Sequence, residues 1–130
     1  MGAWGYGPFE NDGAGDLLAA IRHGDFSFQS VEWAFEDPDY LEVDGGQIAI
    51  ALAALVRVTH GEVPAPTEIG AAQLESFTAQ LDPQRLAWIQ AQLDRSLSDS
   101  ESSEVRELWE ETDDFSNWLQ SSRASQPSTE

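Results

Sequence analysis

Residues 48–56 read IAIALAALV, and this run of nine is the longest apolar stretch of the chain. It lies between Gln47 and Arg57 and is far shorter than the roughly 20 apolar residues that a membrane-spanning helix needs. Apolar side chains recur at helical spacing and also fill most positions between, so the pattern predicts a helix buried on almost all sides. With Asp44 as its N-cap, we expect this helix to run over about 45–59 and to form the centre of the fold.

The residues before this run predict shorter helical segments. A first helix should start at Asp12, as its N-cap, and end near residue 23. Its apolar positions, Ala14, Leu17, Leu18 and Ile21, fall on one side of such a helix. A second, short helix is expected from Ser30, with Trp33 among its apolar residues, before Asp37-Pro38 ends it.

The residues after the central helix continue the helical pattern. A helix is predicted over 69–81, and Asp82-Pro83 supplies the N-cap and first residue of the next helix. Its apolar positions are Leu86, Ile89, Leu93 and Leu97. Two further amphipathic pieces are expected over 105–112 and 115–119.

These elements predict an all-α fold. The chain has 130 residues, of which 41% are hydrophobic, and they include five Trp and six Phe, enough apolar material for one core. We expect a single domain over residues 1–120, a bundle of about five to six helices with the N-terminal segment packed on its body. Residues 121–130 are polar and are predicted to form a disordered tail.

Composition excludes several classes of function. The chain has no Cys, two His, and six basic residues that are all Arg, against 24 acidic residues. A thiol nucleophile, a disulfide framework, a Schiff-base lysine and the lysine of a phosphate-binding loop are therefore excluded, and no cofactor is predicted. The net charge of −18 opposes binding to nucleic acid or to an anionic membrane. No signal-like segment precedes Arg22, so we expect a cytoplasmic protein.

The least ordinary stretch is WGYGPFEND, residues 4–12. Three aromatic residues alternate with Gly and Pro, so every second ring could plug into the body and seal the core. The same pattern could instead leave a partly exposed aromatic surface beside acidic residues, which suits a protein interface. The candidate interface residues are Trp4, Tyr6, Phe9, Glu10, Asn11, Asp12 and Asp16.

Carboxylates near the N-terminus offer a chemical alternative. Asp12 and Asp16 would lie one helical turn apart and, with Glu10, could bind a hard cation or serve acid–base chemistry. Helix capping and the helix dipole explain the same two aspartates, and they explain His23 and His60 near helix C-termini. No catalytic residue and no metal ligand is therefore assigned from the sequence.

Two motifs resemble a known family. Gly2, Trp4, Gly5, Gly7, Phe9, Asn11, Asp12, Ala14 and Asp16 resemble the N-terminal signature of the bacterial domain of unknown function 4259. Residues 103–111, SEVRELWEE, are similar to the C-terminal segment of that family, and the two motifs bracket nearly the whole chain. Gly13, Gly15 and Leu17 depart from the pattern. The resemblance implies a small helical cytosolic protein and brings no catalytic residues with it.

Charge and motifs together favour a non-enzymatic binding protein. Acidic residues occur in every third of the chain, so the folded body itself should attract a basic protein partner. An inhibitor or immunity-type partner of a basic nuclease is one concrete version. The alternative is a metal-dependent or carboxylate-using hydrolase near the N-terminal motif, with His23 or His60 as a helper. A third reading takes the acidity as an adaptation for solubility.

Overall fold

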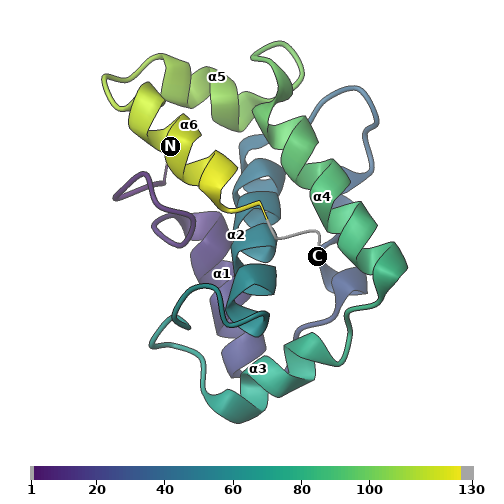
Figure 1. Cartoon of the computed structure of the whole chain (residues 1–130). Coiled ribbons are helices and arrows are strands. Elements are labelled where there is room, and N and C mark those ends of the chain that lie inside the picture. The colour runs from purple at the N-terminus through teal and green to yellow at the C-terminus, as the bar shows by residue number, and fades with distance from the viewer. Residues whose placement is uncertain (1, 127–130) are drawn as a thin grey trace.

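Helix α2 (Val43–Thr59) runs through the middle of the structure, a computed structural model that describes residues 2–126 (Figure 1). Every residue from 45 to 56 is buried, as the apolar run predicts. A helix that is apolar on all sides is stable only where neighbours cover it completely. The other elements are therefore arranged around α2.

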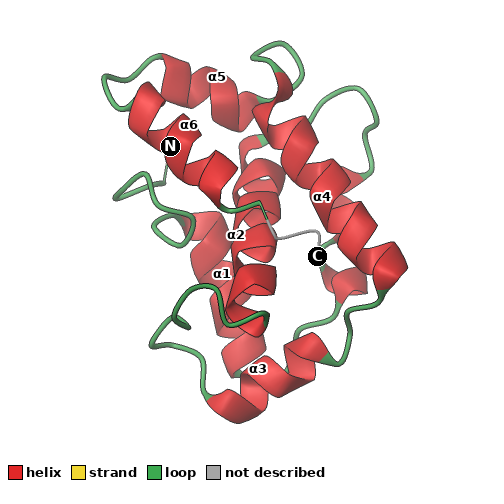
Figure 2. Ribbon diagram, in the orientation of Figure 1, coloured by secondary structure: helices red, strands yellow, loops and turns green. Residues whose placement is uncertain are grey.

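The fold is all-α, and the predicted fold class is confirmed (Figure 2). The elements in chain order are α1 (Asp12–Arg22), the 3₁₀ turns η1 (Phe28–Ser30) and η2 (Glu32–Phe35), α2, α3 (Ala71–Thr78), α4 (Pro83–Ser98), α5 (Glu104–Glu110) and α6 (Phe115–Ala124). Among the described residues, strand-like pairing is confined to two isolated bridges. Within the same range no helix is both long and apolar enough to cross a membrane.

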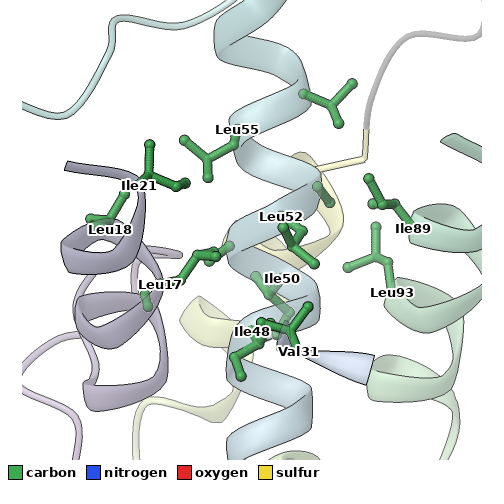
Figure 3. Close-up of a cluster of buried hydrophobic side chains, with 14 of the residues drawn as sticks. Leu17, Leu18, Ile21, Val31, Ile48, Ile50, Leu52, Leu55, Ile89 and Leu93 are labelled. Atoms are coloured by element: carbon green, nitrogen blue, oxygen red, sulfur yellow. The ribbon is translucent and has the colours of Figure 1, made fainter. Parts of the chain in front are cut away.

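Helices α1 and α4 cover opposite sides of α2 (Figure 1). The close-up shows Leu17 of α1 and Ile89 and Leu93 of α4 beside the central helix, where Leu52 and Leu55 lie between the two flanks (Figure 3). All of these side chains are almost fully buried. Burial of each side chain stabilises the fold by about 1.5–3 kcal/mol relative to an exposed position. Most residues of the hydrophobic core belong to α1, α2 and α4.

The start of α4 follows the sequence prediction, whereas the start of α2 does not. The Asp82 carboxylate accepts a hydrogen bond from the backbone N–H of Arg85 at 2.7 Å, with Pro83 as the first helical residue. Helix α2 begins at Val43, before the predicted cap Asp44, which lies in its first turn. The backbone N–H of Val43 instead donates to the Glu104 carboxylate at 2.8 Å. The prediction was wrong because the capping group comes from another helix.

Two predicted helices are reduced in the structure. In place of the α-helix predicted from Ser30, the chain forms the 3₁₀ turn η2, and a second such turn, η1, ends at Ser30. In this geometry Val31 is buried while Trp33 stays 56% exposed, although it was expected among the apolar residues of a helix. The helix predicted over 69–81 is α3, Ala71–Thr78, whose N-cap residue Gly70 has no side chain to hold an earlier turn.

The end of the domain also differs from the prediction. Helix α6 continues to Ala124, and Ser122 and Ser125 are buried. The predicted tail over 121–130 is therefore wrong for its first residues, because small side chains allow the last turns of α6 to pack closely. Residues 127–130 of that tail lie outside the described residues.

Candidate functional site

The N-terminal segment is a closed loop that leads into α1. The backbone N–H of Trp4 donates to the carbonyl of Glu10 at 3.0 Å, and that of Asp12 donates to the carbonyl of Gly2 at 2.8 Å. The Glu10 carboxylate turns back into the same loop, where it accepts from the N–H of Gly7 at 3.0 Å. These bonds bring residues 2–4 alongside 10–12.

The three aromatic residues of this loop divide between core and surface. Phe9 is partly buried and packs against the core, as the sealing interpretation predicts. Trp4 and Tyr6 remain 66% and 44% exposed, as the surface interpretation predicts. The edge of the Trp4 ring lies 4.0 Å from the place where a Cβ on Gly15 would sit, so the ring rests beside α1.

Asn11, and not Asp12, is the N-cap of α1. Its side-chain oxygen accepts from the backbone N–H of Ala14 at 2.8 Å, and the residue is buried. An amide caps a helix as well as a carboxylate does, and it is less costly to bury. Asp12 is the first residue of the helix and stays exposed, so its carboxylate is available for another role.

Asp12 and Asp16 both line a cleft of about 340 Å³. The cleft lies between α1, the η1–η2 segment and the first turns of α2. Its lining residues are Asp12, Gly13, Asp16, Leu17, Ala20, Asp25, Phe26, Ser30, Val31, Trp33, Asp44 and Ile48. Its size falls at the lower end of the roughly 300–1,000 Å³ typical of ligand sites. We call it the α1–η2 cleft.

The α1–η2 cleft has an apolar floor and an acidic rim. Leu17, Phe26, Val31 and Ile48 belong to the core and are buried. The four aspartates of the lining are exposed, and within residues 2–126 none of them has an ion-pair or hydrogen-bond partner for its carboxylate. None of the six Arg residues lines the cleft. The protein therefore leaves this concentration of negative charge uncompensated.

Trp33 also lines a second hollow of about 240 Å³. The second hollow is lined by Trp33, Ala34, Glu36, Asp37, Tyr40, Glu42 and Gly45. Burial and the neighbouring carboxylates of Glu104, Glu107 and Glu42 raise the pKa of Tyr40. The phenol is thus protonated at neutral pH and keeps its hydrogen-bond donor. Trp33 stands as an exposed ring with acidic residues on both sides.

The structure does not bring the proposed hydrolase residues together. Asp12 and Asp16 share the cleft, but the Glu10 carboxylate is held in the N-terminal loop. His23 lies next to Arg22 and His60 contacts Glu62, each at the C-terminal end of a helix. In the part of the chain that is described, no group of three or more His, Asp or Glu residues could hold a metal ion.

Sequence reasoning missed Trp33, Asp25 and Asp44 as part of a site. The sequence predicts Trp33 among the apolar residues of a short helix and Asp44 as a helix cap. One signal was present, because Trp33 lies between Glu32 and Glu36 in the sequence, a setting in which an exposed ring beside carboxylates is reasonable.

These features define a small all-α domain in which the exposed ring of Trp33 and carboxylates without a partner among residues 2–126 border an apolar cleft. The chain belongs to the family described as Domain of unknown function (DUF4259), whose model matches residues 2–121. The resemblance found in the sequence is thereby confirmed at the level of the family. No curated protein and no solved structure matches the chain.

Proposed function

We propose that this chain is a non-enzymatic binding module for a basic protein. The observation that carries the proposal is the combination, around α1, of exposed rings with carboxylates that have no partner among the described residues. Trp4 lies beside α1, and Trp33 lines the same cleft as Asp12 and Asp16. Aromatic residues are enriched at protein interfaces, where a rigid ring buries a large area at small entropic cost.

Charge supports the choice of a basic partner. The chain carries a net charge of −18, and four of its carboxylates line the cleft, where no Arg of this chain neutralises them. Such a field accelerates encounter with a cationic surface and repels an anionic one. An inhibitor or immunity-type partner of a basic nuclease is one form of this function, located in the cytoplasm.

Affinity capture from the native lysate tests the proposal. The tagged protein is used at low and at high salt, and bound proteins are identified by mass spectrometry. We expect one stoichiometric basic protein that elutes as salt rises, because screening weakens attraction between exposed charges. Absence of any specific protein at both salt concentrations would overturn the proposal.

Two double variants distinguish the effect of the cleft carboxylates from the effect of the total negative charge. Asp12→Asn with Asp16→Asn should reduce capture. Glu75→Gln with Asp94→Asn removes the same charge from exposed positions on α3 and α4 and should not. If both pairs reduced capture equally, only the total negative charge of the protein would matter. A binding surface at Asp12 and Asp16 would then be refuted.

The metal-dependent alternative makes a contrary prediction. A metal that binds the native state must raise the melting temperature by mass action. Because Glu10 is turned away from Asp12 and Asp16, we expect Ca²⁺, Mg²⁺, Mn²⁺ and Zn²⁺ each to shift the melting temperature by less than about 1 °C. Thermal unfolding followed by circular dichroism is the measurement, and a clear rise with any of these ions would favour the alternative.

A further inference from the structure

We propose that the α1–η2 cleft receives an arginine side chain of the basic partner. The inference rests on the proposed function and adds the location and the chemistry of its central contact. The cleft has an apolar floor between Leu17 and Ile48 and an exposed indole, Trp33, at its edge. A purely polar ligand would leave this floor unused.

The occupant must combine an apolar stem with a cationic end. A long basic side chain does so, because its methylene groups cover apolar surface while the charge stays at the edge. The carboxylates of Asp12, Asp16, Asp25 and Asp44 stand around the opening and have no partner among the described residues. Charge complementarity therefore selects a cation for the position above the floor.

Arginine fits this position better than lysine. Its planar guanidinium can stack on an indole while its five N–H groups still donate to carboxylates in several directions. Lysine offers a compact charge that does not stack in this way. With Trp33 at the edge and four aspartates around the opening, both properties of arginine would be used.

The fold already contains an arginine held in this way. The guanidinium of Arg85 lies 4.5 Å from the centre of the Phe28 ring and 5.1 Å from that of Trp88. The same side chain contacts the Glu32 carboxylate at 3.4 Å. The combination of aromatic faces and a carboxylate thus binds a guanidinium within this chain, and the cleft presents the same groups without an internal arginine.

The test uses three capped tripeptides, acetyl-Ala-X-Ala-amide with X as arginine, lysine or citrulline. Citrulline keeps the shape of arginine and lacks its charge. Each is titrated into the full-length ¹⁵N-labelled protein at low salt, and backbone and indole N–H signals are followed by NMR. We expect the arginine peptide to shift the signals of Gly13, Ala20, Ile48 and the Trp33 indole, with citrulline binding at least about tenfold more weakly.

Variants assign the binding to the cleft. Trp33→Ala removes an exposed ring and should weaken the arginine peptide about two- to fivefold without unfolding the protein. Asp16→Asn should weaken it to a similar extent, whereas Glu75→Gln on α3 should leave the dissociation constant unchanged. Equal effects of Asp16→Asn and Glu75→Gln, equal binding of arginine and lysine, or shifts spread over the whole acidic surface would each overturn the inference.

The outcomes also separate this inference from the proposed function. Arginine peptide bound in the cleft, with no basic protein captured from lysate, supports the site and refutes the proposed function. Capture that depends on Asp12 and Asp16 but survives Trp33→Ala, with no peptide bound in the cleft, refutes the arginine site and leaves the proposed function standing.

Discussion

Asn11 and Asp12 are neighbours with different roles, and the difference is a single hydrogen bond that only the Asn11 side chain accepts from the start of α1. Asn11 uses its side chain to cap α1, and it is buried in doing so. The Asp12 carboxylate does not cap the helix and lines the cleft instead. The sequence prediction placed the cap at Asp12, one residue too late, because both residue types are good N-caps. The structure thus assigns one to stability and the other to the candidate site.

Substitution of Asn11 tests this division. We expect Asn11→Ala to lower the free energy of unfolding by about 1 kcal/mol, because it leaves the N–H of Ala14 without its acceptor. Asn11→Ser keeps an oxygen at the cap and should lose less. Urea unfolding measures both changes. A larger loss for Asp12→Ala than for Asn11→Ala would return the cap to Asp12 and contradict the structure.

At the scale of elements, the packing of α5 on α2 depends on a glycine. A Cβ on Gly46 would overlap the Val105 side chain of α5, which is itself fully buried. Glycine is poor in a helix, and its presence in the first turns of a buried helix is explained by this close approach. The contact places Glu104 where it accepts from the N–H of Val43.

Two Gly→Ala substitutions should therefore change the free energy of unfolding in opposite directions. Gly46→Ala should lower the free energy of unfolding by about 1–3 kcal/mol, because α5 must move away from α2. Gly15→Ala in α1 meets nothing closer than the Trp4 ring at 4.0 Å and should raise it by about 0.5–1 kcal/mol. The comparison is made by urea unfolding, and stabilisation by Gly46→Ala would show that the two helices are not in close contact.

The connection between α4 and α5 is ordered by Asp99. Its carboxylate accepts hydrogen bonds from the Ser102 hydroxyl at 2.9 Å, the Ser102 N–H at 2.8 Å and the Glu101 N–H at 3.0 Å. The carbonyl of Ser102 in turn accepts from the N–H of Leu41, just before α2. These bonds fix the connection against the segment that enters the central helix.

The same hydrogen bonds give this connection a pH dependence. The Ser102 hydroxyl and the backbone N–H groups hold the pKa of Asp99 below its usual range. A lowered pKa in the folded state stabilises the protein above the unfolded value, near pH 4, and this contribution is lost as pH falls through the folded pKa. The stability advantage of the wild type over Asp99→Ala, from urea midpoints, should thus shrink on acidification below about pH 4. An advantage that does not change with pH would contradict this account.

In the whole molecule, the local sequence patterns predicted the helices but not the contacts between helices that are distant in the sequence. The run at 48–56 identifies the buried centre, and Asp82-Pro83 identifies the start of α4, because both signals are contained in neighbouring residues. The cap of Val43 comes from Glu104, 61 residues away, and no local pattern could indicate it.

The candidate site was predicted only in part for the same reason. Asp12 and Asp16 share a helix face, so their proximity is visible in the sequence. Trp33 and Asp44 reach the cleft through the packing of α1 and the η1–η2 segment against α2, which is a property of the tertiary fold. The exposure of Trp33 follows from the 3₁₀ turns that replace the predicted helix.

We propose that the cleft carboxylates, which have no partner among residues 2–126, bind a basic protein. The most direct test is the dissociation constant of the captured partner, measured from about 0.05 M to about 0.5 M NaCl for the wild type and for Asp12→Asn with Asp16→Asn. We predict that affinity falls at least about tenfold over this range and that the variant pair shows a shallower dependence on salt. An affinity that is independent of salt in the wild type would contradict the account.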